Sequence, residues 1–159
     1  MGFNIKVDTK SLAKELNQTV EDIRKGAKQG ANILASEIKN MEVELIHMTT
    51  GQQTYVPTGE LARSVQLDVK IDTDDYIKID IAPSVEYAPY VELGTGKFAS
   101  DGNGRQDSWI IYLGQDENGK DIFRYTHGIP PHFFVRDTKE FFEPIAEEIV
   151  QDEIRKYLK

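Results

Sequence analysis

The chain has 159 residues, no cysteine, and 27 acidic against 19 basic residues, which gives a formal net charge of −8. The lack of cysteine excludes disulfides, thiolate zinc sites and cysteine nucleophiles, and the acidic excess argues against binding nucleic acid by phosphate neutralisation. No apolar run approaches the roughly 20 residues that span a membrane, and residues 1–10 lack the apolar core of a signal peptide, so we expect a protein made in a cytoplasm and bound to no membrane.

A short strand and a long helix are expected at the start of a single domain that covers residues 1–159. Phe3, Ile5 and Val7 alternate with polar residues, as on a half-buried strand. The helix is predicted over residues 9–46, because apolar residues recur there at a mean step of about 3.67. At about 1.5 Å per residue it would be roughly 55 Å long, so one end is expected to overhang. The apolar positions are Leu12, Leu16, Val20, Ile23, Ala27, Ala31, Leu34, Ile38, Met41 and Leu45.

Gly26 and Gly30 lie one turn apart inside this helix, where each costs up to about 1 kcal/mol relative to alanine. They indicate a bend or close packing, either against another helix of the same chain or against another subunit. We expect packing within the chain, because most amphipathic helices bury a face in this way. The side opposite the apolar stripe is polar and includes Lys25, Lys28, Lys39 and Glu42.

The middle of the chain is expected to form a loop over residues 47–57 and then an antiparallel sheet of about four strands over residues 58–126. The loop segment is polar and rich in glycine, and Thr58 can cap a short helical turn that follows it. Apolar side chains then alternate along two runs, which predicts a hairpin with one apolar face. These side chains are Val65, Leu67, Val69 and Ile71 in the first run, and Ile77, Ile79 and Ile81 in the second.

Residues 85–96 are typical of a strand end, one or two turns of helix and a glycine loop. The short helix is expected near residues 88–93, with Pro89 in its first turn and Gly94 in the left-handed conformation at its end. The run from Gly94 to Lys97 resembles a phosphate-binding loop, but it lacks the first glycine and the final serine or threonine of that pattern. We therefore expect no nucleotide and no other cofactor.

A second hairpin and a C-terminal helix complete the expected α+β fold. Asn118-Gly119 is a strong signal for a tight turn between two strands. The helix is predicted over residues 132–158, packed on the sheet. It should be kinked or broken near residues 141–143, because Pro144 cannot continue the backbone hydrogen bonding of a helix.

Two histidines are the strongest candidates for chemistry. His127 and His132 lie five residues apart around two prolines, so they cannot share a helical face as paired metal ligands do. They could serve a small metal- or ligand-binding domain together with nearby carboxylates, or they could be loop histidines with ordinary hydrogen bonds, which we prefer. No serine has the context of a hydrolase nucleophile. We expect no metal, no catalytic residue and no enzymatic activity.

Aromatic side chains are concentrated in the second half of the chain, beside glycine-rich segments. A thin sheet flanked by helices buries only part of such a set, and exposed aromatic residues are typical of protein–protein surfaces. The alternative is that all of them lie in the core. They are Tyr87, Tyr90, Phe98, Trp109, Tyr112, Phe123, Tyr125, Phe133 and Phe134.

Three blocks of sequence resemble a known family. They read Thr58-Gly59-x-Leu61-x-x-Ser64, Val85-x-Tyr87-Ala88-x-Tyr90-Val91-Glu92-x-Gly94-Thr95 and His127-Gly128-x-Pro130-x-x-Phe133. In order and spacing they resemble the head–tail joining proteins of long-tailed bacteriophages and their prophages, the tenth-gene-product family of lambda-like phages. The resemblance covers residues 57–138, and the middle block is its most specific part.

The resemblance implies a non-enzymatic α+β protein of the virion, placed at the head–tail junction and assembled in the host cytoplasm. Copies would form a ring between portal or head-closure proteins and the tail tube, in contact with other neck and tail proteins, and DNA would pass through without specific binding. A tail-terminator or another tail-assembly protein is the alternative. The residues implied in structure or assembly are Thr58, Gly59, Leu61, Tyr87, Ala88, Tyr90, Val91, Glu92, Gly94, Thr95, Pro130 and Phe133.

Overall fold

The computed structural model describes residues 2–9, 20–50, 59–72 and 76–158, which divide into two compact units. The body unit comprises Met1–Val85 and Phe134–Lys159, and the hairpin unit comprises Glu86–Phe133. The expected single domain stays a prediction, and each unit is described by itself.

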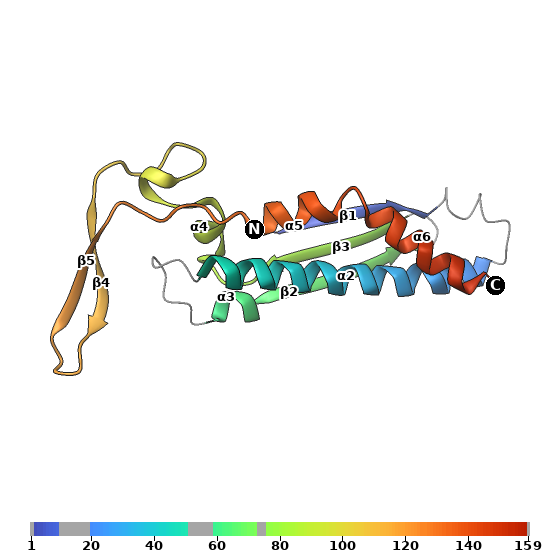
Figure 1. Cartoon of the computed structure of the whole chain (residues 1–159), viewed down its shortest axis with the longest axis horizontal. Coiled ribbons are helices and arrows are strands. Elements are labelled where there is room, and N and C mark those ends of the chain that lie inside the picture. The colour runs from blue at the N-terminus through green and yellow to red at the C-terminus, as the bar shows by residue number, and fades with distance from the viewer. Residues whose placement is uncertain (1, 10–19, 51–58, 73–75, 159) are drawn as a thin grey trace. The chain divides into compact units, whose positions relative to one another are not determined.

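A three-stranded antiparallel sheet forms one layer of the body unit, in the order β1-β3-β2 (Figure 1). Its strands are β1 (Phe3–Asp8), β2 (Val65–Asp72) and β3 (Tyr76–Pro83). The register places Ile79 between Ile5 and Val69, so the alternating apolar side chains of all three strands share one face. The predicted first strand and first hairpin are confirmed.

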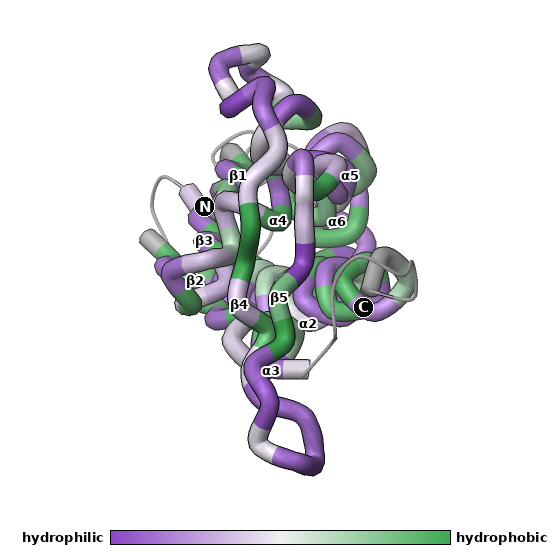
Figure 2. The backbone as a smooth tube through the Cα atoms, turned by 90° about the vertical axis from the view of Figure 1, so that its left-hand side faces the viewer, coloured by the Kyte–Doolittle hydropathy of each residue, from purple (hydrophilic) through white to green (hydrophobic). Residues whose placement is uncertain are grey.

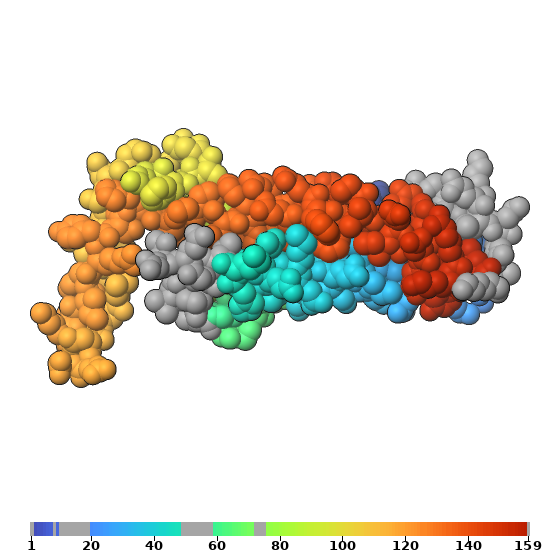
Figure 3. Space-filling view, in the orientation of Figure 1, coloured from blue at the N-terminus to red at the C-terminus, as the bar shows by residue number. Residues whose placement is uncertain are grey.

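Helices cover the apolar face of this sheet and form the second layer. They are α2 (Val20–Thr50), α5 (Phe134–Phe142) and α6 (Ala146–Tyr157), and a short helix, α3 (Glu60–Arg63), precedes β2. Figure 3 shows the side chains of α5 and α6, in orange to red, lying directly against those of α2, in cyan to blue. The predicted C-terminal helix is broken on both sides of Pro144, which confirms the expected break.

The long helix α2 begins at Val20 in the described part of the chain and continues to Thr50, four residues beyond the predicted end. Residues 47–50 of the predicted loop are therefore helical, and residues 51–57 lie outside the described residues. Residues 10–19, which include Leu12 and Leu16, lie outside the described residues, and so does the predicted Thr58 cap.

The buried stripe of α2 differs from the predicted one at both ends. Val20 is exposed, whereas Glu42, which was assigned to the polar side, is completely buried. Met41 and Leu45 are only half-buried. The reason is that residues four apart form one of the ridges by which helices pack, and the second half of α2 follows such a ridge. Its buried members are Ile38, Glu42 and Ile46.

The two glycines of α2 pack against α6, as expected for contact within the chain. A Cβ atom on Gly26 would lie 2.6 Å from the Cα atom of Ile154, and one on Gly30 would lie 2.9 Å from the Cα atom of Val150. Real Cβ atoms do not approach backbone atoms this closely, so both positions need a residue without a side chain. The glycines set the distance between α2 and α6.

The hairpin unit contains two short helical segments and a two-stranded antiparallel sheet. They are α4 (Ala88–Leu93), η1 (Gly96–Phe98), β4 (Trp109–Gln115) and β5 (Asp121–Thr126). The predicted short helix is confirmed at its predicted residues. The turn between the strands contains Asn118-Gly119, as predicted, and the Asp116 carboxylate closes it by accepting the amides of Asn118 and Lys120 at 2.9 Å.

The described chain has the predicted α+β class, with five strands in two sheets instead of about four strands in one. The sheet expected over residues 58–126 is therefore divided, because β4 and β5 pair only with each other within the described residues. Alternating hydrophobicity identifies a strand but does not identify its neighbour, so the sequence could not separate the two hairpins.

Candidate assembly surface

The most specific sequence block, residues 87–95, forms α4 and the loop that follows it. Pro89 occupies the first turn, where a helix needs no amide donor. The side chain of Tyr90 points outward and is exposed, and Tyr87 is half-buried. The buried side chains of the block are Ala88, Val91 and Glu92. One side of the block therefore packs inside the hairpin unit, and the other side exposes the ring of Tyr90 to solvent.

Backbone hydrogen bonds hold the third block against the second. The amides of His132 and Phe133 donate to the carbonyls of Val91 and Glu92, each at 3.1 Å. Two segments about forty residues apart in the sequence thus form one scaffold, which gives the blocks a structural role.

Thr95 and Gly94 extend this pairing. The Thr95 amide donates to the carbonyl of Ile129 at 2.9 Å, and the Ile129 amide donates back to Oγ1 of Thr95 at 3.1 Å. Gly94 has φ 74° and ψ 172°, a combination essentially restricted to glycine. The predicted left-handed helical conformation is wrong, because the chain leaves α4 in an extended direction to pair with Ile129. A Cβ atom on Gly94 would lie 2.7 Å from the backbone nitrogen of Pro131.

The end of the third block is strained. Phe133 has φ 51°, and it is the one described non-glycine residue with positive φ. A bulky aromatic residue rarely adopts this conformation. The hydrogen bond from its amide to Glu92 holds it in place. Pro130, earlier in the same block, is exposed.

The first block lies in the body unit, so the structure brings together the second and third blocks only. Gly59 has φ 71° at the start of α3, Leu61 is buried, and Thr58 lies outside the described residues. Ser64 ties the block to the end of β3: its hydroxyl donates to the Leu61 carbonyl at 2.7 Å, and its carbonyl accepts the Ser84 amide at 3.0 Å.

The β4–β5 hairpin exposes apolar side chains on both of its faces. The register pairs Ile110 with Tyr125 and Tyr112 with Phe123, so these four side chains share one face, here called the aromatic face. They are between 53% and 74% exposed, and Ile122 on the opposite face is 41% exposed. The rings of Tyr112 and Phe123 lie 5.5 Å apart. Figure 2 shows the hydrophobic stretches of both strands in green.

The alternative in which every aromatic residue lies in the core is wrong. Phe134 is completely buried, and Tyr87, Trp109 and Phe133 are half-buried. The remaining five are exposed, namely Tyr90, Phe98, Tyr112, Phe123 and Tyr125. All five belong to the hairpin unit, so the exposed aromatic surface is concentrated there.

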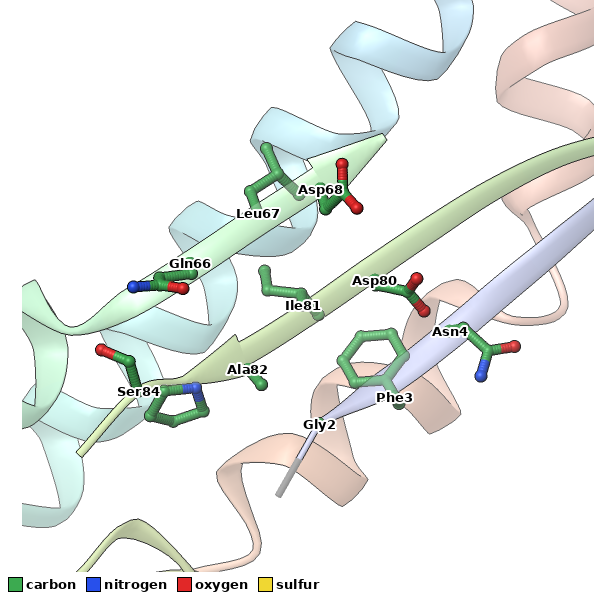
Figure 4. Close-up of a pocket in the computed structure, with 11 residues that line it drawn as sticks. Gly2, Phe3, Asn4, Gln66, Leu67, Asp68, Asp80, Ile81, Ala82 and Ser84 are labelled. Carbon is green, nitrogen blue, oxygen red and sulfur yellow. The ribbon is translucent and has the colours of Figure 1, made fainter. Parts of the chain in front are cut away.

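A shallow hollow of about 350 Å³ lies at one end of the sheet in the body unit (Figure 4). The register places Asn4, Asp80 and Asp68 side by side on the face turned away from the helices. Lys78 lies 2.8 Å from the Asp80 carboxylate, and Lys70 lies 3.2 Å from that of Asp68. Each carboxylate is thus paired with a lysine of its own strand.

The two candidate histidines have different surroundings within the hairpin unit. His127 is exposed, and its carbonyl accepts the Lys97 amide at 3.0 Å. His132 is half-buried, and this burial lowers the pKa of its imidazole below 6.5. Within the described residues, no three histidine, aspartate or glutamate side chains lie close enough together to hold a metal ion. None of the described helices combines the length and the hydrophobicity needed to cross a bilayer.

A comparison with family models decides the affiliation. The model described as "Bacteriophage HK97-gp10, putative tail-component" matches residues 7–94, more than half of the chain. The chain belongs to the HK97-gp10-like family. No curated protein and no solved structure matches it.

The HK97-gp10-like match agrees with the resemblance in the first two blocks of sequence. It runs from β1 through α2, the first hairpin and α4, and it ends at Gly94. The third block, the β4–β5 hairpin, α5 and α6 lie beyond it. The family match therefore supports the class of protein but not the role of the exposed hairpin.

Sequence reasoning identified the aromatic residues of the hairpin and Ile122 but missed Ile110. Ile110 was missed because only the alternating residues Trp109, Ile111 and Leu113 of its strand were expected to be apolar. The signal was present: residues 109–113 read Trp-Ile-Ile-Tyr-Leu without interruption. Such a run is typical of a strand covered on both faces.

The burial of His132 predicts a pH dependence of stability. The unfolded chain takes up a proton on this imidazole as the pH falls through 6.5, whereas the folded chain resists it. The contribution of neutral His132 to the free energy of unfolding is therefore fully present above pH 6.5 and declines below it. Between pH 7.5 and 5.5, the unmodified protein should lose more stability than His132→Gln in urea denaturation. The matched control His127→Gln, at an exposed position, should follow the unmodified protein, and identical losses in all three would contradict the prediction.

Proposed function

We propose that this chain is a structural subunit of the phage neck, where copies form a ring between the portal or head-closure proteins and the tail tube. It acts by contact with neighbouring proteins and carries out no catalysis. The match to a phage tail-component family carries this proposal. It makes the chain a structural protein of the phage tail or neck and supports a location in the virion.

The charge and the exposed surface favour assembly over chemistry. The aromatic face is the kind of surface that protein partners cover. A ring needs contacts between unlike surfaces that close by rotation. With a net charge of −8, the subunits would let DNA pass through the ring without binding it. Fluorescence anisotropy with labelled duplex DNA at low salt should accordingly show no binding at micromolar protein concentrations.

Deleting the gene from the phage or prophage that encodes this chain tests the neck role. Electron microscopy of the lysate should show DNA-filled heads and separate tails of normal length that do not join. Supplying the chain from a plasmid should restore joined particles, and antibody labelling should mark the head–tail junction. Joined, infectious particles in the deletion strain would overturn the proposal.

The same experiment distinguishes the neck role from that of a tail terminator. A terminator ends the growth of the tail tube, so its loss would give tails of abnormal and variable length. Normal tail lengths together with unjoined heads therefore support the neck role, and irregular tails support the alternative.

A further inference from the structure

We propose that the β4–β5 hairpin is the surface by which one copy of this chain binds the next, with both faces of the hairpin covered in the assembled ring. The inference rests on the proposed ring. It adds the location of the contact, which lies beyond the residues of the family match.

The composition of the two strands indicates two covered faces. In a hairpin with one solvent-exposed face, apolar and polar residues alternate along each strand. In β4 and β5 the only charged side chains are those of Asp121 and Arg124. The aromatic face is apolar. Three further apolar residues of the two strands do not belong to it, namely Ile111, Leu113 and Ile122. This pattern belongs to a buried pair of strands, yet the single chain leaves much of it exposed.

An isolated two-stranded sheet is also a weak structure in water. Such a hairpin is marginally stable unless other strands or a helix cover it. Within the hairpin unit, β4 and β5 pair only with each other. Covering the apolar side chains would therefore stabilise the hairpin as well as bind the partner.

The charge of the two strands is compatible with a second copy of the chain as that partner. Two copies that each carry a net charge of −8 repel one another. The strands of the hairpin carry one carboxylate and one guanidinium, so they are net neutral. Contact through these strands therefore adds no net like-charge repulsion of its own. Covering both faces also favours a head-to-tail arrangement, because a contact about a two-fold axis on one face would leave the other exposed.

The area of the aromatic face agrees with a contact that is weak alone and effective in a ring. Aromatic side chains bury about 150–250 Å² each, so the three rings and the isoleucine of this face, each more than half exposed, offer roughly 400–500 Å² per copy. A stable two-protein interface buries about 800 Å² on each partner. One such contact falls short of a stable dimer, whereas a closed ring makes two contacts for every subunit.

Introduced charges test each face of the hairpin. Phe123→Asp alters the aromatic face, and Ile122→Asp alters the opposite one. Both positions are exposed, so thermal unfolding should shift by only a few degrees. In sedimentation velocity over a concentration series, each variant should raise the concentration needed for assembly at least tenfold. Phe141→Asp, which alters an exposed phenylalanine on α5, is the matched control and should assemble normally.

A photoreactive benzoylphenylalanine in place of Tyr112 identifies the protein that covers the hairpin. In assembled particles, mass spectrometry should find it joined to another copy of this chain. Crosslinks to a tail-tube or portal protein instead would overturn the choice of partner, and normal assembly of Phe123→Asp and Ile122→Asp would overturn the use of the hairpin. Rings that form through another surface would leave the neck role intact, whereas joined particles in the deletion strain would overturn that role independently.

Discussion

Replacing Phe134 with alanine is expected to lower the free energy of unfolding by about 3–5 kcal/mol. Among the described residues, Phe134 has the largest completely buried side chain, and it is the first residue of α5. Its carbonyl accepts the buried Thr138 hydroxyl at 2.7 Å, which anchors the first turn. The substitution removes the ring from the core and leaves a cavity that this anchored turn cannot easily fill.

Chemical denaturation followed by circular dichroism measures this loss. The matched control is Phe141→Ala in the same helix, because Phe141 is 54% exposed and should lose less than about 1 kcal/mol. Equal losses in the two variants would show that Phe134 does not anchor the core of the body unit.

Replacing Gly26 with leucine is expected to destabilise the body unit by about 1–3 kcal/mol. Helix propensity alone predicts the opposite sign, because leucine favours a helix by almost 1 kcal/mol over glycine. The close approach of α6 decides the outcome: a Cβ atom would lie 2.6 Å from the Cα atom of Ile154. A backbone atom cannot rotate away, so the two helices must separate along their whole contact.

For Gly26→Leu, the decisive result is whether the free energy of unfolding rises or falls. Lys25→Leu, at the exposed neighbouring position, is the control and should be neutral or slightly stabilising. Gly26→Ala should also destabilise, by a smaller amount. A higher melting temperature for Gly26→Ala than for the unmodified protein would mean that α6 does not pack there in solution.

The sequence predicted the elements of the fold well because each has a local signal. Alternation identified β1 and the first hairpin, Pro89 marked the start of α4, and Pro144 marked the break between α5 and α6. The residue against which a side chain packs has no such local signal. The sequence indicated a bend or close packing at Gly26, and only the fold shows that Ile154 is its close neighbour.

Glu42 shows where the local signal misleads. A carboxylate in a helix is normally assigned to solvent, because burying a charged group is costly. Its neighbours one turn away in each direction, Ile38 and Ile46, are buried, and Glu42 lies on the same ridge. The packing of the whole layer therefore outweighs the preference of one side chain.

The sequence indicated that the protein has an exposed aromatic surface, but it did not indicate which elements form that surface. The aromatic excess indicated a protein–protein surface, and the sequence blocks indicated the family. Within the blocks, Thr95 and Phe133 hold backbone segments together. The exposed residues lie on the neighbouring strands, where tertiary placement rather than local pattern decides exposure.

The close packing of α6 on α2 also affects how the chain folds during its synthesis. Domains generally fold as units while translation proceeds, yet α6 leaves the ribosome after every other element of the body unit. Until it does, the face of α2 that carries Gly26 and Gly30 remains open to water and to other nascent chains. Folding of the body unit is therefore completed only after α6 has been synthesised.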